Sequence, residues 1–123
     1  MADEKFDIME KIVYDNDFNA FKQEIESGTD INLQNKYGWS LLHISIRRDR
    51  RDMVNYLLEK GADINRLDGV GWTPLMEAVM DDMPDLCALL IEKGADTSIA
   101  NARGATAAVL VQKFGRDSMK SLF

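Results

Sequence analysis

The sequence predicts an all-α fold: a solenoid of about four stacked helix–turn–helix repeats with short β-hairpin-like tips. Two short motifs recur with a fixed period of 33 residues. The copies of the first motif are Gly28-Thr29-Asp30, Gly61-Ala62-Asp63 and Gly94-Ala95-Asp96. The copies of the second are Gly38-Trp39-Ser40, Gly71-Trp72-Thr73 and Gly104-Ala105-Thr106. A fixed period of this length is typical of stacked supersecondary units. The repeats that we predict, within a single domain, are approximately residues 2–34, 35–67, 68–100 and 101–123.

Length and composition fit one ordinary domain, since the 123 residues are 46% hydrophobic and can bury a core. No apolar run approaches the roughly 18 residues that cross a bilayer, and the start of the chain does not resemble a signal peptide. We therefore expect a cytoplasmic protein that does not bind membranes. Cys87 is the only cysteine, and its repeat counterpart is Val54. We expect Cys87 to be a small buried hydrophobe rather than a reactive thiol.

The net charge of -6 argues against nucleic acid as a partner, because phosphates call for a basic face. The charge alternates along the chain. Residues 1–35 carry three basic and nine acidic side chains, and residues 36–66 carry seven and four. Residues 67–100 carry one and seven, and residues 101–123 carry four and one. Adjacent repeats of opposite sign could favour one stacking order, and a simply solvated surface is the alternative.

The first repeat is the most degenerate. We expect residues 1–5 to fray, and apolar residues at helical spacing predict a helix from Phe6 to about Asp15. Phe18, Phe21 and Ile25 predict a second helix that ends at Gly28. The repeat carries more polar residues than its neighbours, as a terminal cap that faces water requires.

The second repeat begins with the turn Asn35-Lys36-Tyr37-Gly38. Ser40 is placed to cap a helix over about Leu41–Arg48. A second helix over about Arg51–Lys60 should stop at Gly61.

The third and fourth repeats follow the same plan. Thr73 should cap a helix whose first position is Pro74, where the missing N–H has no cost. Pro84 should open a second helix that ends at Gly94. In the fourth repeat Thr106 should cap a helix, and the helix after it is cut short.

These landmarks resemble the ankyrin repeat, whose units carry Gly-x-Thr-Pro-Leu-His near the start and Gly-Ala-Asp-x-Asn near the end. Thr73-Pro74-Leu75 and the two Gly-Ala-Asp triplets match this pattern. Ser40-Leu41-Leu42-His43 keeps the histidine without the proline, and Thr106-Ala107-Ala108-Val109 has neither. The resemblance implies that His43 hydrogen-bonds the backbone rather than acting in catalysis. It also implies a protein-binding surface, without identifying the partner.

The resemblance places the partner-binding positions at the tips and on the helix face that follows each tip, where they line a concave groove. At the tips these positions are Lys36, Tyr37, Trp39, Val70, Trp72 and Arg103. On the helices they are Tyr14, Asp15, Ile44, Arg47, Arg48, Glu77, Met80, Asp81, Lys113 and Phe114. Helix positions three and four apart share a face, so we expect each helical set to project together.

Trp39 and Trp72 are the strongest candidates among them, because turn chemistry does not require tryptophan and Ala105 stands at the same position of the fourth repeat. Two large aromatic side chains on exposed tips are typical interface anchors. The alternative is that each ring lies flat over its own repeat. Arg47 and Arg48 could likewise pair locally with nearby aspartates. A charge at Glu77, facing the groove, favours a basic group on a partner.

No sequence pattern indicates catalysis. We found no phosphate-binding glycine loop, no His/Cys/Asp cluster at metal-ligand spacing and no pair of carboxylates in an apolar setting. We therefore expect no enzyme activity, no cofactor and no metal. The expected function is to bind another protein, one with a basic surface, and to block it as an inhibitor or a toxin-immunity protein does. An adaptor or scaffold is the alternative, and self-association stays open.

Overall fold

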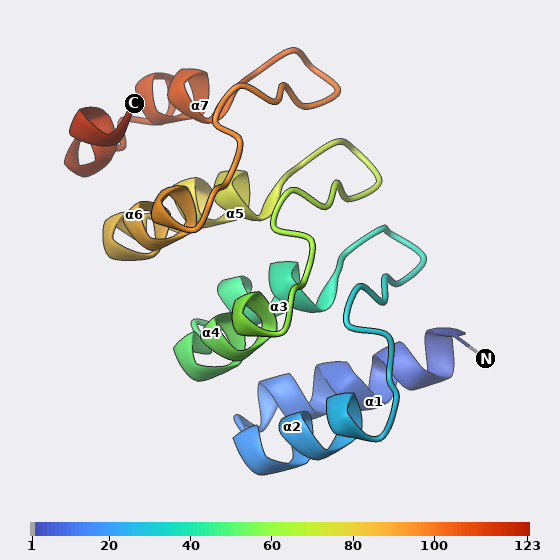
Figure 1. Ribbon diagram of the computed structural model, residues 1–123. Coiled ribbons are helices and arrows are strands. Elements are labelled where there is room, and N and C mark those ends of the chain that lie inside the picture. Colours follow the sequence, from blue (N-terminus) through green and yellow to red (C-terminus); the bar gives the residue numbers. More distant parts are fainter. Residues whose placement is uncertain (1) are drawn as a thin grey trace. The chain divides into compact units, whose positions relative to one another are not determined.

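The computed structural model describes residues 2–123, which contain seven α-helices and one 3-10 helix and no strand. The helices are α1 (Ala2–Tyr14), α2 (Phe18–Glu26), α3 (Leu41–Arg47), α4 (Arg51–Glu59), α5 (Pro74–Met80), α6 (Pro84–Glu92), α7 (Ala107–Lys113) and the 3-10 helix η1 (Asp117–Leu122). This succession of short helix pairs confirms the all-α repeat class (Figure 1). The chain divides into two compact units, Met1–Asp63 and Ile64–Phe123. That the repeats form a single domain stays a prediction.

The first unit holds two helix pairs. α1 lies against α2 and α3 against α4, while α1 also contacts α3 and α2 contacts α4. The interior is apolar, with Phe6, Met9, Phe21 and Leu57 fully buried. Burial of this apolar stripe is what holds helices of only seven to thirteen residues in place, because isolated helices of that length are marginal in water.

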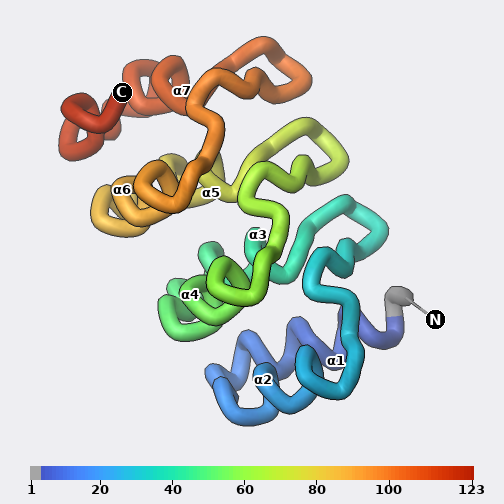
Figure 2. Tube along the Cα trace, in the orientation of Figure 1, coloured from blue at the N-terminus to red at the C-terminus, as the bar shows by residue number. Residues whose placement is uncertain are grey.

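The second unit repeats the arrangement with α5, α6, α7 and η1. α5 lies against α6 and α7, and η1 contacts both α6 and α7. Its interior includes Leu75, Leu86, Leu90 and Met119, all at most 1% exposed. The chain trace shows the two tips of this unit on the same side of its helices (Figure 2).

The predicted helix starts are confirmed. Ser40, Thr73 and Thr106 are the N-caps of α3, α5 and α7, and each side chain accepts a bond from the backbone N–H three residues on. His43 is buried and completes a capping box, since the Ser40 N–H donates to its Nδ1 over 3.2 Å. The structural role expected for His43 is therefore confirmed within its own turn.

One expectation for the first repeat is wrong. α1 is helical from Ala2, so residues 2–5 do not precede the helix, whereas Met1 lies outside the described residues. The physical reason is a tertiary contact that sequence spacing did not show, because Lys5 Nζ lies 3.0 Å from a carboxylate oxygen of Glu24 on α2. The N-cap of α2, Asp17, was also not predicted.

Only one isolated antiparallel bridge, Gln34 to Ser40, is found in the described part of the chain. The β-hairpin character of the tips therefore stays a prediction. In the fourth repeat the shortened second helix is present as the 3-10 helix η1, consistent with the expectation.

Candidate protein-binding surfaces

In each tip, the side chain of one Asn or Asp accepts hydrogen bonds from two backbone N–H groups of the same tip. Asn35 Oδ1 accepts bonds from the N–H groups of Tyr37 and Trp39, at 3.0 and 2.9 Å. Asp68 Oδ1 and Asn101 Oδ1 accept bonds from the residues two and four positions on in the same way. The short amide or carboxylate supplies the acceptor that closes an Asx turn. Consequently all three tips have the same backbone connections, whatever side chains they display.

In the second unit the two tips are also tied to each other. The Ala102 N–H donates to the Val70 carbonyl over 3.0 Å, and the Asp96 N–H donates to Asn65 Oδ1 over 2.8 Å. The backbones approach closely at Gly71, where an added Cβ would lie 3.0 Å from Ala102 N. In the first unit Asn32 Oδ1 accepts the corresponding bond from the Asp63 N–H, also over 2.8 Å.

The predicted residues of the first unit form a layer of cations over aromatic rings. The Arg47 guanidinium carbon lies 4.1 Å from the centre of the Trp39 ring, and that of Arg48 lies 4.9 Å from the centre of Tyr14. Tyr37 packs against Trp39 with ring centres 5.5 Å apart. Lys36 Nζ stands 5.2 Å from the centre of the Tyr37 ring. Arg47 and Arg48 thus lie over aromatic rings, and in the same run of arginines and aspartates Arg51 pairs locally with Asp49.

Two shallow pockets accompany this layer. One, of about 250 Å³, is lined by Trp39, Ile44, Arg47 and Arg48 together with two residues of α1. The other, of about 190 Å³, is lined by Lys36, Tyr37 and Trp39 with Asn35 and two acidic residues of α1. The structure therefore brings together six of the predicted residues of the first unit.

The expectation that Ile44 projects from the surface is wrong. Only 4% of Ile44 is exposed, although it lines the first of these pockets. It turns inward because α3 lies against both α1 and α4, and every residue from Leu41 to Ile46 is buried. Only Arg47 of α3 and the following Arg48 reach the solvent on that helix face.

Another pocket, of about 500 Å³, belongs to the second unit. It brings together five of the predicted residues, Val70, Trp72, Arg103, Lys113 and Phe114. The rest of its lining comes from the tip of the fourth repeat and from α7. Val70 and Phe114 are 57% and 43% exposed, so apolar side chains at this pocket meet water.

The exposure expected for the tryptophans is wrong. Trp39 and Trp72 are half-buried, and Trp39 is covered by Tyr37 and by Arg47 of its own repeat. The alternative, a ring lying over its own repeat, describes Trp39. The tips do expose the apolar or aromatic side chains of Tyr37 and Val70, each at 57%, together with the cations Lys36 and Arg103.

The remaining predicted residues lie outside these pockets. Glu77 and Met80 are half-buried on α5 and Asp81 is exposed just after it. Asp15 is engaged by Lys11, whose Nζ lies 2.7 Å from its carboxylate, and this hydrogen bond raises the pKa of Lys11. Asp15 is therefore already paired in the unbound chain.

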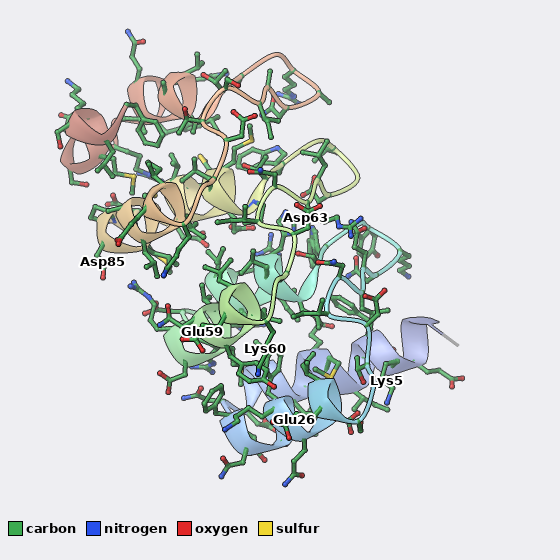
Figure 3. All side chains as sticks on the ribbon, in the orientation of Figure 1. Lys5, Glu26, Glu59, Lys60, Asp63 and Asp85 are labelled. Atoms are coloured by element: carbon green, nitrogen blue, oxygen red, sulfur yellow. The ribbon has the colours of Figure 1, made fainter. Side chains whose placement is uncertain are left out.

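Sequence reasoning missed one pocket, on the α2 and α4 side of the first unit. It has a volume of about 400 Å³ and a polar lining of Lys22, Glu26, Asn55, Glu59 and Lys60 around the rings of Phe18 and Tyr56. Figure 3 shows Glu26 at the end of α2 and Glu59 with Lys60 at the end of α4. The available signal was Tyr56, an aromatic residue where the next repeat has Leu89.

Cys87 is buried, as predicted, and its Sγ lies 3.6 Å from the sulfur of Met119. Burial, followed by the nearby charges of Asp85 and Asp82, raises the pKa of its thiol to about 12. The thiol is therefore protonated at neutral pH. Among residues 2–123 no three His, Cys, Asp or Glu side chains are grouped as metal ligands, and no helix there is long and apolar enough to cross a membrane.

Comparison with known proteins identifies the repeats. A family model described as ankyrin repeats (3 copies) matches residues 9–101. No curated protein matches the chain.

Proposed function

The chain belongs to the ankyrin-repeat family, whose repeats are protein–protein interaction modules, and from this premise we propose that it binds and blocks one partner protein. The binding surface consists of the tips and of the helix faces that follow them. The observation that supports this most is the grouping of eleven predicted residues at pockets that expose apolar and cationic side chains. Exposed aromatic and arginine side chains of this kind are the usual anchors of interfaces.

Blocking is favoured over recruitment because a short repeat array offers about one interface of standard size. The partner that we propose carries a basic surface. Seven acidic side chains against one lysine in residues 67–100 would attract it and speed its association. An inhibitor or a toxin-immunity protein works in this way. We further propose a non-catalytic role in the cytoplasm, a reducing compartment that suits the free, buried Cys87.

The second candidate is an adaptor that holds two partners. It is favoured by the difference between the two units. The first unit displays cations over aromatic rings, whereas the second displays a larger apolar pocket. Two chemically distinct surfaces could serve two ligands.

Affinity capture from the native cell tests the proposal. The bait is the full chain, compared with a variant in which three exposed side chains are cut back, Tyr37→Ala, Val70→Ser and Phe114→Ser. We expect one partner at near-equal stoichiometry on the wild type and little on this variant. The control bait carries Gln23→Ala and Glu92→Ala, on α2 and α6, and should capture the partner normally.

The activity of the captured partner then separates the two candidates. If the chain blocks its partner, adding it abolishes that activity, and the three-residue variant does not. An unchanged activity, together with a second protein in the same complex, would favour the adaptor. Equal capture by all baits would show that the tips are not the interface.

A further inference from the structure

The pocket of the second unit lies where the fourth repeat lacks a tryptophan. Trp39, Trp72 and Ala105 occupy the same repeat position, and their backbones are held identically. Each donates its N–H to the Asx side chain four residues earlier, at 2.9, 2.9 and 3.1 Å. Ala105 therefore presents a methyl group where the other two tips present an indole ring, and it lines the pocket.

The lining suits an aromatic ring. It includes Val70, Val109, Leu110 and Phe114, and Val109 and Phe114 are 45% and 43% exposed. Its volume of about 500 Å³ falls in the usual range of ligand pockets, about 300–1,000 Å³. Removing these apolar side chains from water, by placing an apolar group of a ligand in the pocket, is energetically favourable.

The charged residues of the lining are both cations, Arg103 and Lys113, and both are exposed. Lys113 stands at the repeat position of Arg47, which lies 4.1 Å over the Trp39 ring. In the fourth repeat that ring is absent, and Lys113 Nζ lies 5.7 Å from the ring of Phe114. A cation is thus placed to lie over a ring that enters the pocket, or to pair with a carboxylate beside that ring.

The walls are fixed before any ligand arrives. The bond from the Ala102 N–H to the Val70 carbonyl joins the two tips, and the close approach at Gly71 leaves no room for a side chain there. On the helix side, the Arg116 guanidinium donates to the carbonyls of Val79 and Met80. A preorganised pocket loses little conformational entropy on binding.

We propose that this pocket takes an aromatic side chain of the partner protein, one that has acidic residues beside it in the partner's sequence. The ring fills the place of the tryptophan that the fourth repeat lacks, and Arg103 and Lys113 contact the carboxylates. This inference rests on the proposed function and narrows the partner to a protein that carries an exposed acidic–aromatic segment, which binds at Arg103 and Lys113, in addition to the basic surface that faces the acidic residues of the third repeat.

The test uses a defined probe, a blocked pentapeptide with two glutamates on each side of one tryptophan. Titrated into the full-length ¹⁵N-labelled chain, it should shift the amide signals of residues 102–105 and 109–114 in a saturable way. Two control peptides replace the tryptophan with alanine or the glutamates with lysines. We expect affinity to fall about tenfold or more without the aromatic ring, the loss that a buried aromatic contact implies.

The matched variant is Ala105→Trp, which fills the pocket with the chain's own residue. It should fold, because two other tips accept tryptophan on the same backbone, and unfolding temperature checks this. We expect it to lose binding of the acidic peptide about tenfold or more. Should it not fold, the surface variant Arg103→Glu/Lys113→Glu decides, and it should weaken the acidic peptide and strengthen the lysine peptide.

Several results would overturn the inference: no binding of the acidic peptide, equal binding of the lysine peptide, unchanged binding by Ala105→Trp, or shifts outside the pocket. Concentration-dependent dimerisation that Ala105→Trp abolishes would assign the pocket to a second copy instead and would also overturn it. If the captured partner depends on the exposed tip residues while no acidic–aromatic peptide binds, this inference fails and the proposed function stands.

Discussion

At the scale of single residues, one arginine in each unit joins two successive repeats. Arg50 donates from Nε to the Val13 carbonyl and from Nη2 to the Tyr14 carbonyl, at 2.8 and 2.7 Å. Arg116, two repeats later in register, does the same for Val79 and Met80. Each guanidinium satisfies the carbonyls at the end of a helix, which have no partner within the helix.

We predict that Arg116→Ala destabilises the chain by about 1–3 kcal/mol, because two hydrogen bonds from a charged, half-buried group are lost. Urea unfolding followed by circular dichroism measures the change. Lys120→Ala is the control, since this side chain is 66% exposed and pairs with the exposed Asp117. It should change stability by less than about 0.5 kcal/mol. Equal effects of the two substitutions would contradict the role given to Arg116.

A second prediction concerns Cys87 and the stability of the fold at alkaline pH. Its folded pKa of about 12 lies above the ordinary thiol value of 9.0, so above pH 9 the unfolded chain loses a proton that the folded chain keeps. Stability from this group is complete below about pH 9 and falls as pH rises toward 12, by at most about 1.4 kcal/mol per pH unit. The measurement is the difference in unfolding free energy between wild type and Cys87→Val from pH 8 to 10.5. A difference that does not change with pH would contradict the burial argument.

At this scale, the sequence predicted some residue roles and not others. The three N-caps and the burial of Cys87 followed from local chemistry and repeat register. The exposure of Trp39 did not, because it depends on Arg47, eight residues later, folding back over the ring. The roles of Arg50 and Arg116 were not predicted, because Met83 stands at the same repeat position in the third repeat and hides the recurrence of arginine there.

At the scale of elements, the two helices of each repeat are joined by a residue in the left-handed conformation. In the first three repeats this residue is Asn16, Asp49 or Asp82, with φ of 56°, 56° and 55°, and in the fourth it is Gly115, with φ of 66°. Asparagine, aspartate and glycine are the residues that adopt this conformation most readily. The turn that separates α7 from η1 therefore depends on backbone freedom.

We predict that Gly115→Ala destabilises the chain by about 1 kcal/mol. An added Cβ at Gly115 would meet no atom within 4 Å, so the loss reflects conformation and not a clash. Thermal unfolding compares it with Gln112→Ala, an exposed position of α7 where alanine is favourable. If both variants unfold at the wild-type temperature, the left-handed turn does not limit the stability of the fourth repeat.

Elements were the most predictable scale. Glycine and proline positions and the 3.6-residue periodicity located every α-helix to within a few residues, apart from the start of α1. The 3-10 form of η1 was not predicted, and neither was the burial of its Met119 beside Cys87, a residue 32 positions earlier in the chain.

At the scale of the whole molecule, charge and surface chemistry are distributed unevenly along the chain. The family resemblance places sixteen partner-binding positions at the tips and on the helix faces that follow them, and eleven of these residues line pockets. That they contact a partner stays a proposal. The pockets themselves could not be predicted, because they arise where one repeat departs from its neighbours, as Ala105 does.

We predict that association with the captured partner slows as ionic strength rises, because the acidic third repeat steers a basic partner. Stopped-flow binding at 50 and 300 mM salt measures this. The variant Asp81→Lys/Asp85→Lys should associate more slowly and depend less on salt, whereas Glu26→Lys/Glu59→Lys, on the α2 and α4 side, should behave as wild type. Equal association rates for all three proteins would contradict electrostatic steering by the third repeat.

The central claim is that the partner contacts the tips and the helix faces after them. Hydrogen–deuterium exchange of the chain, with and without the captured partner, tests this most directly. We predict that the partner slows exchange at residues 36–39, 69–72 and 102–105 and along 109–114, and leaves α2, α4 and α6 unchanged. Protection confined to α2, α4 and α6, with the tips exchanging freely, would contradict the claim.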